Sequence, residues 1–193
     1  MATPTSLPKI VVIVGSNRRE SINHKLAQAL VRLGSGKFDA KFVRIDDLPM
    51  FNQDLEASLP PEVLRYKNEV SAADGVLIVT PEHDRSIPAL LKNAIDWGAR
   101  PYGKSIWPNK PVFITGASPG AIGTALAQQH LRSVMVGLGA LLLGGEAYIM
   151  FKPGLIDEQG NISDDGTKAF LQRFVDQFSV FVARLSQPAA TPS

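Results

Sequence analysis

The chain has 193 residues, of which 45% are hydrophobic and 20% are charged, and its formal net charge is +2. This balance is typical of a folded globular protein, and the small net charge argues against a nucleic-acid-binding surface. The sequence contains no cysteine, which excludes thiol catalysis, disulfides, cysteine-ligated zinc and iron–sulfur clusters. The histidines at positions 24, 83 and 130 show no metal-ligand spacing, so we expect no metal site. Any redox chemistry would therefore require an organic cofactor.

The hydrophobic pattern predicts strands and helices that alternate along the chain. Short apolar runs predict five strands: Lys9–Val14, Asp39–Ile45, Gly75–Val79, Pro111–Thr115 and one within Ala140–Ile149. Helical spacing predicts five helices: Ile22–Leu33, Pro60–Ala73, Pro88–Trp97, Gly123–Val136 and Asp164–Leu185. Such an order requires parallel strands with helices on both faces. We therefore expect one doubly wound α/β domain over residues 1–193, with frayed ends at residues 1–8 and 187–193.

No targeting signal is recognisable in the sequence. The first residues, MATPTSLP, are polar and contain proline, unlike a signal peptide. The later hydrophobic runs are too short to span a membrane. We therefore expect a cytoplasmic protein without a membrane span.

The loop after the first strand has the features of a phosphate site. It reads GSNRRESIN over Gly15–Asn23 and enters a helix, whose free N–H groups and dipole favour an anion. Hydroxyls, an amide and a guanidinium would hold the anion: Ser16, Ser21, Asn23, and Arg18 or Arg19. The alternative is that Ser21 only caps the helix and the arginines are solvated. The strand before the loop and the helix after it favour the phosphate site.

The same loop indicates what kind of phosphate would bind. A dinucleotide-binding turn requires G-x-G-x-x-G, but Asn17 and Glu20 stand where the later glycines would be. The glycines and Lys-Ser/Thr of a P-loop are also absent. A mononucleotide with a terminal monophosphate therefore fits best.

The loop after the third predicted strand reads TPEHDRSIP over Thr80–Pro88. Prolines at positions 81 and 88 make both of its ends rigid. The amides and polar side chains between them could line the edge of a flat heterocycle. The alternative, left open here, is a polar turn in which Ser86 caps the next helix.

The loop after the fourth predicted strand reads GASPGAIG over Gly116–Gly123, and its small residues would let a ligand approach the backbone. It also spells G-x-S-x-G, the nucleophile motif of α/β-hydrolases. Pro119 follows the serine and lacks the N–H that an oxyanion hole requires. The later histidine, His130, lies close by on the next helix without an acidic partner. The sequence therefore disfavours a hydrolase.

Together these segments resemble the NADPH-dependent FMN reductase family, in particular its bacterial quinone and chromate reductase branch. The resemblance rests on three stretches: GSNRRESINHKLA at Gly15–Ala27, TPEHDRSIPALLKNAIDW at Thr80–Trp97, and GASPGAIGTALAQQHLR at Gly116–Arg132. It implies a flavodoxin-like three-layer fold, a five-stranded parallel sheet in the order 2-1-3-4-5, and non-covalent FMN. It also implies a homodimer or homotetramer.

The resemblance assigns positions around the flavin. The phosphate and ribityl end would contact Ser16, Arg18, Ser21 and Asn23. The isoalloxazine would be bordered by Pro81, Glu82, His83, Asp84 and Ser86, and closed on its other side by Ser118 and Gly120. Relatives often have Tyr-Asn where this chain has His83-Asp84. An aspartate only accepts hydrogen bonds, and its charge would oppose an anionic reduced flavin.

The implied activity is transfer of electrons from NADPH or NADH through FMN to quinones, chromate or similar small acceptors. Donor and acceptor would use one face in turn, which predicts ping-pong kinetics. The flavin would carry the chemistry, so no catalytic side chain is expected. Arg100 would attract a nicotinamide phosphate or lie at a subunit boundary, unless it only complements a helix dipole. The main alternative function is a flavodoxin-type electron carrier, although such carriers are typically strongly acidic.

Overall fold

The computed structural model describes residues 6–186. Its strands are β1 (Lys9–Val14), β2 (Asp39–Phe42), β3 (Gly75–Val79), β4 (Pro111–Ser118), β5 (Leu141–Leu142) and β6 (Tyr148–Met150). Its helices are α1 (Ile22–Leu33), the short 3-10 helix η1 (Gln53–Ala57), α2 (Pro61–Ser71), α3 (Ala89–Ala99), α4 (Ala125–Gly137) and α5 (Asp165–Leu185). Residues 6–8 have no regular secondary structure. The rest of the predicted frayed ends, residues 1–5 and 187–193, lies outside the described residues.

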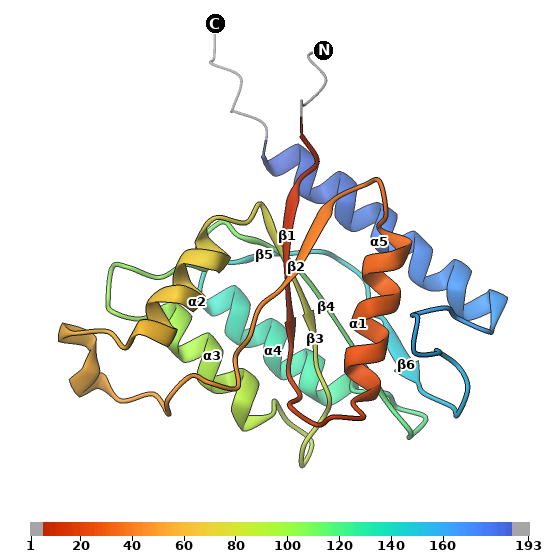
Figure 1. Ribbon diagram of the computed structural model, residues 1–193, viewed down its shortest axis with the longest axis horizontal. Coiled ribbons are helices and arrows are strands. Elements are labelled where there is room, and N and C mark those ends of the chain that lie inside the picture. Colours follow the sequence, from red (N-terminus) through yellow and green to blue (C-terminus); the bar gives the residue numbers. More distant parts are fainter. Residues whose placement is uncertain (1–5, 187–193) are drawn as a thin grey trace, which may run out of the picture.

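All the paired strands are parallel, and the sheet order is β2-β1-β3-β4-β5. This confirms the predicted order 2-1-3-4-5. The order reverses between β1 and β3, where ligands bind in open α/β sheets. The carboxyl ends of β1, β3 and β4 lie together at the lower edge of the molecule in Figure 1.

The edge beside β4 differs from the prediction, because two short strands occupy the place of one. β5 pairs with the beginning of β4 through Pro111↔Leu141, and β6 pairs with its end through Gly116↔Tyr148. Between them, Gly145 has φ +86°, which side-chain-bearing residues rarely adopt. Pairing with β6 also extends β4 to Ser118, three residues beyond its predicted end.

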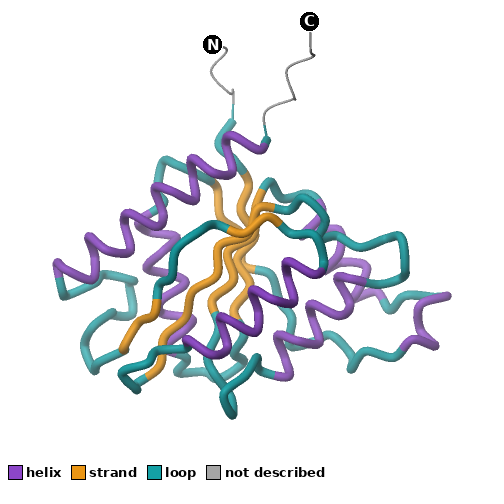
Figure 2. Tube along the Cα trace, turned by 180° about the vertical axis from the view of Figure 1, so that it is seen from behind, coloured by secondary structure: helices purple, strands orange, loops and turns teal. Residues whose placement is uncertain are grey.

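Apolar side chains alternate between the two faces of the sheet, as the period of a strand requires. In β1, Ile10 and Val12 face the core cluster that contains α1 and α5. Val11 and Ile13 face the cluster that contains α2, α3 and α4. Figures 1 and 2 show the resulting three layers, with the sheet between the two sets of helices.

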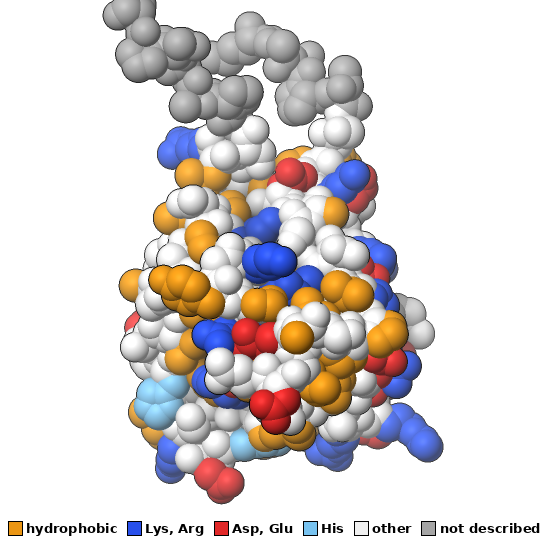
Figure 3. All heavy atoms as spheres, turned by 90° about the vertical axis from the view of Figure 1, so that its left-hand side faces the viewer, with side chains coloured by type: hydrophobic (Ala, Val, Ile, Leu, Met, Phe, Trp, Pro, Cys, Tyr) orange, Lys and Arg blue, Asp and Glu red, His pale blue; other side chains and the backbone are white. Residues whose placement is uncertain are grey.

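The molecular surface mixes charged and apolar side chains. On the face in Figure 3, basic and acidic side chains are interspersed with apolar ones and form no stripe of a single sign. Within residues 6–186, no helix has the length and apolar character needed to cross a membrane. The large apolar side chains that are exposed include those of Ile122, Leu126 and Val136. Ile122 lies just before α4, and the other two lie on it.

A buried ammonium group joins α2 to the end of α3. Lys67 is only 9% exposed, and burial lowers the pKa of its ammonium group. Its Nζ donates to four backbone carbonyls at 2.5–3.4 Å: those of Trp97, Gly98, Arg100 and Lys104. The last carbonyls of a helix have no intrahelical partner. The Trp97 and Gly98 carbonyls also accept from the N–H groups of Arg100 and Ile106. Lys67 is therefore the donor on which the carbonyls of Arg100 and Lys104 depend among the described residues.

We expect Lys67→Met to lower the free energy of unfolding by about 1–2 kcal/mol, because the carbonyls of Arg100 and Lys104 lose their donor. Urea unfolding of both proteins measures the change. Lys92→Met is a matched control, because Lys92 forms an exposed ion pair with Asp96 at 2.7 Å. The control should change stability by no more than about 0.5 kcal/mol. Equal losses in the two variants would contradict the role assigned to Lys67.

Candidate cofactor-binding site

A hollow of 580 Å³ lies beyond the carboxyl ends of β1, β3 and β4. Its walls come from all three loops that the sequence singled out, together with the first turns of α1 and α3. The volume falls within the range of about 300–1,000 Å³ that is usual for ligand pockets. The site therefore lies at the position that the strand order favours.

The first loop lines one end of this hollow, the end predicted to bind an anion. Ser21 is the N-cap of α1, and its Oγ accepts a hydrogen bond from the His24 N–H at 3.3 Å. Its hydroxyl hydrogen stays available for a ligand, because a serine both donates and accepts. The first N–H groups of α1, those of Ile22 and Asn23, have no intrahelical partner. Arg18 lines the same end of the hollow, and its side chain is exposed. Capping the helix and binding a phosphate are thus compatible roles for Ser21.

Asn23 is buried, and its side chain joins the first loop to the third. Its Nδ2 donates to the Ala117 carbonyl at 2.9 Å, and its Oδ1 accepts from the Ala117 N–H at 2.8 Å. Both ends of the amide are therefore used inside the protein. The proposed contact of Asn23 with a phosphate would come from its backbone N–H.

The second loop turns back on itself as a tight hairpin. The His83 and Ser86 backbones exchange hydrogen bonds of 3.1 and 2.8 Å. The two residues between them, Asp84 and Arg85, have φ +48° and +65°, as a type I′ turn requires. The helix that follows has Pro88 at its N-cap and no side-chain cap. The alternative that Ser86 caps this helix is therefore wrong, because the hairpin turns its side chain elsewhere.

Glu82 joins the second loop to α4. Its Oε2 accepts hydrogen bonds from the N–H groups of Leu126 at 2.9 Å and Ala127 at 3.1 Å. These donors belong to the first turn of α4, where a negative charge also complements the helix dipole. Thr124, the N-cap residue, makes no side-chain capping bond there. A glutamate from 44 residues earlier in the chain therefore does the capping.

We expect Glu82→Ala to lower the free energy of unfolding by about 1–2 kcal/mol, because α4 loses its cap. Glu82→Gln keeps an oxygen acceptor and loses only the charge, so we expect a loss of about 0.5 kcal/mol. Chemical denaturation of the two variants measures the difference. A Gln variant as unstable as the Ala variant would show that the charge, and not the hydrogen bonds, is what matters.

The third loop leaves β4 at a point of very close packing. A Cβ on Gly116 would lie 2.0 Å from the Thr80 carbonyl oxygen, so only glycine fits. Farther along, the Ser118 hydroxyl bonds to the N–H and carbonyl of Gly120, both at 3.2 Å. His130 contacts Ser86 and not Ser118. The loop therefore shows no nucleophile paired with a base, in agreement with the argument against a hydrolase.

The structure brings most of the predicted site residues together. Eight of them line the hollow: Ser16, Arg18, Ser21, Asn23, Pro81, Glu82, His83 and Ser118. Asp84, Ser86 and Gly120 belong to the same loops but do not line it. Sequence reasoning missed Leu90 and Pro119, which also line it and add apolar wall. No signal in the sequence marks Leu90, because it looks like an ordinary core residue of a helix.

Arg100 lies apart from the hollow. It follows the last residue of α3, about 16 Å along a helix that begins beside the site. Its Nε donates to Glu56 Oε1 at 2.6 Å, which ties α3 to η1. The predicted contact with a nicotinamide phosphate or a second subunit stays a prediction, and the guanidinium already has one acidic partner.

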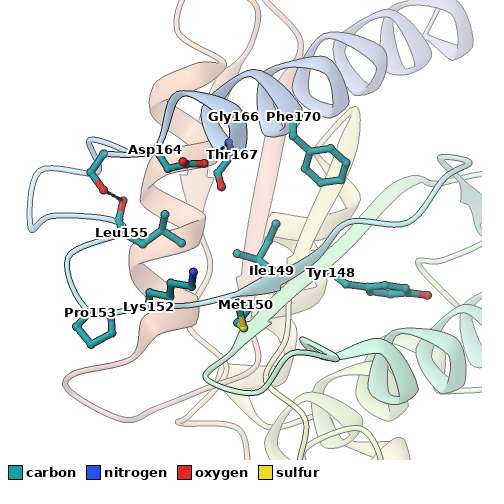
Figure 4. Close-up of a pocket in the computed structure, with 11 residues that line it drawn as sticks. Tyr148, Ile149, Met150, Lys152, Pro153, Leu155, Asp164, Gly166, Thr167 and Phe170 are labelled. Atoms are coloured by element: carbon teal, nitrogen blue, oxygen red, sulfur yellow. Dashed lines mark hydrogen bonds between the residues drawn. The ribbon is translucent and has the colours of Figure 1, made fainter.

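A second hollow, of 590 Å³, lies between β6 and the start of α5. Figure 4 shows Lys152 and Phe170 extending into it. Asp164 already caps α5 by accepting from the Thr167 N–H at 2.6 Å, so an anion is disfavoured there. This hollow is also away from the switch in strand order. Over residues 6–186, no cluster of His, Asp or Glu side chains could hold a metal ion.

The fold and the first hollow define a mononucleotide-binding protein of the flavodoxin-like class. A flavodoxin, WrbA-like protein from Agrobacterium tumefaciens shares this fold, with a TM-score of 0.62, 17% identity, and coverage of 93% of this chain and 99% of that chain. FerB, a flavoenzyme NAD(P)H:(acceptor) oxidoreductase from Paracoccus denitrificans, is more similar. Its TM-score is 0.89 at 41% identity, covering 92% of this chain and 98% of that chain.

Sequence comparisons narrow the class. A model of the family described as NADPH-dependent FMN reductase matches residues 8–153. A 2-hydroxy-1,4-benzoquinone reductase from a Burkholderia species is 46% identical over 175 residues, 90% of this chain and 96% of that protein. A quinone reductase from Pseudomonas putida is also 46% identical, over 90% of this chain and 94% of its own length. The chain belongs to the NADPH-dependent FMN reductase family, which confirms the predicted FMN cofactor and NAD(P)H donor.

Proposed function

We propose that this enzyme passes electrons from NAD(P)H through non-covalent FMN to quinones. The observation that carries the proposal is the hollow itself, whose anion-binding end and flat-ring end lie at the switch in strand order. The names of the two 46%-identical relatives support quinones as the acceptor class. Chromate remains a further acceptor that the same assay would test.

The residues of the hollow suit the two chemically different ends of FMN. At the start of α1, Ser16, Ser21, Arg18 and two free N–H groups would bind the phosphate. Pro88, Leu90 and Pro119 supply apolar wall for a flat ring. Pro81, Glu82, His83 and Ser118 would border the ring, with Asp84, Ser86 and Gly120 at the rim. When bound, FMN supplies the hydride and electron chemistry.

The chain itself contributes orientation. The Asn23 and Glu82 hydrogen bonds hold the first and second loops against the end of β4 and the start of α4. A ligand that touches these loops meets groups that are already in place, which reduces the entropy lost on binding.

Asp84 is exposed and does not line the hollow. Its charge is therefore screened by water, and we expect its effect on the flavin to be small.

We further propose that the chain acts as a single FMN-binding domain in a cytoplasmic homodimer or homotetramer. Large apolar side chains that are exposed, among them Met50, Tyr102 and Val136, support association, because exposed apolar surface favours an interface. A cytoplasmic location is supported by the lack of cysteine and by the use of NAD(P)H as donor. Light scattering coupled to size exclusion tests the oligomeric state.

The visible absorption spectrum of the purified protein tests the proposed function directly. We expect a flavin spectrum that bleaches when NADPH is added without oxygen and returns when a quinone is added. A flavin spectrum that NADPH leaves unchanged would indicate an electron carrier. Absence of flavin after incubation with FMN would overturn the proposal.

Two neighbouring arginines test the phosphate end of the site. We expect Arg18→Gln to weaken FMN binding by about 10-fold or more, since a hydrogen bond to a charged group contributes about 1.5–3 kcal/mol. Arg19→Gln is the matched control, because Arg19 is equally exposed but does not line the hollow. Fluorescence quenching of FMN on titration with each variant measures the dissociation constants. Similar affinities for the two variants would remove Arg18 from the site.

A further inference from the structure

One polar pair at the rim of the site has no part in the function described so far. The Ser86 Oγ lies 3.0 Å from His130 Nδ1. Ser86 belongs to the hairpin of the second loop, directly across from His83, which lines the hollow. His130 lies on the exposed face of α4, one turn beyond the two N–H groups that Glu82 caps. Two separate elements therefore present a hydroxyl and an imidazole to each other beside the site.

The protonation of this histidine determines which way the serine hydroxyl points. When Nδ1 carries no proton it can only accept, so the Ser86 O–H donates to it. When the imidazole is fully protonated, Nδ1–H donates to Ser86 Oγ, and the hydroxyl hydrogen must turn to another acceptor. Histidine is the side chain that ordinarily changes charge between about pH 5 and 8. The Ser86 hydroxyl can thus donate a proton to a ligand, and the protonated imidazole of His130 can replace that proton.

Quinone reduction needs such a proton. A quinone that accepts a hydride gains two electrons and one hydrogen and becomes a hydroquinone monoanion. One more proton on the second oxygen completes the hydroquinone. We propose that Ser86 delivers this proton to the quinone oxygen and takes its replacement from the imidazolium of His130. His130 then regains a proton from water, which its exposed position allows. The inference rests on quinones being the acceptors.

Among the described residues, His130 is the side chain that hydrogen-bonds to the Ser86 hydroxyl. His83, the other imidazole of this hairpin, lines the hollow but makes no side-chain hydrogen bond to Ser86 among those residues. The charged side chains of the hairpin loop are Glu82, Asp84 and Arg85, and Glu82 is held by α4 and lies 3.7 Å from Arg85. The strands on which α4 packs, β4 and β5, carry no titratable side chain. On α4 itself, Arg132 donates to the carbonyls of Leu143 and Gly145.

A comparison of two acceptors tests the proposal. Enzyme reduced by one equivalent of NADPH is mixed rapidly with p-benzoquinone, or with ferricyanide, which takes electrons without protons. We expect Ser86→Ala to slow reoxidation by quinone on the order of 100-fold more than it slows reoxidation by ferricyanide. His130→Gln should slow the quinone step similarly, and the double variant should be no slower than either one, because the two act as a unit.

Ser133→Ala is the matched control, since Ser133 is exposed on α4 one turn beyond His130; it should leave both rates unchanged. Proton NMR adds a readout without turnover, because the chain has only three histidines and the His130 signal is the one missing in His130→Gln. Ser86→Ala should change the chemical shift of that signal, because it removes the hydroxyl that is bonded to Nδ1.

Three results would overturn the proposal: equal slowing with both acceptors, slowing with neither, or a His130 signal that Ser86→Ala leaves unchanged. Failure of the proposed function is a separate result, namely a wild-type flavin that NADPH does not reduce. Dithionite would then supply the electrons, and the same two acceptors would still test the proton step.

Discussion

The site depends on hydrogen bonds that join three loops from distant parts of the sequence. The Asn23 amide holds the start of α1 to Ala117 at the end of β4, with both of its bonds under 3.0 Å. Glu82 holds the second loop to the first turn of α4. Without these contacts each loop would be an exposed turn. With them, the loops form one wall around a hollow that has polar groups at one end and apolar residues at the other.

The two ends of the hollow are formed by different physical means. The anion-binding end relies on backbone groups, because the N–H groups at the start of α1 have no other partner. The ring end relies on close packing and rigid turns. Gly116 lets β4 approach Thr80 as no larger residue could. The hairpin holds Asp84 and Arg85 at positive φ, which costs a non-glycine residue on the order of 1 kcal/mol or more. That strained turn carries Ser86 to His130.

Much of the fold was predictable because its signals are local. The strand and helix order, the parallel sheet and the boundaries of β1, β3 and α1 follow from short hydrophobic patterns and from Gly15 and Gly34 as stops. The division of the fifth strand was not predicted, because only pairing along the whole of β4 separates β5 from β6. The capping role proposed as an alternative for Ser86 was wrong, because the N-cap residue of α3 is Pro88 and not Ser86.

The sequence by itself determined the family, the cofactor class and the three loops that carry the site, because each of these is a property of a contiguous stretch. Tertiary structure decided what the individual side chains do. It turned the Asn23 amide inward to Ala117, made Glu82 the cap of a helix 44 residues away, and paired Arg100 with Glu56. It also brought His130 to Ser86. A hydrogen bond depends on distance and angle between atoms, and those are set only when the whole chain has packed.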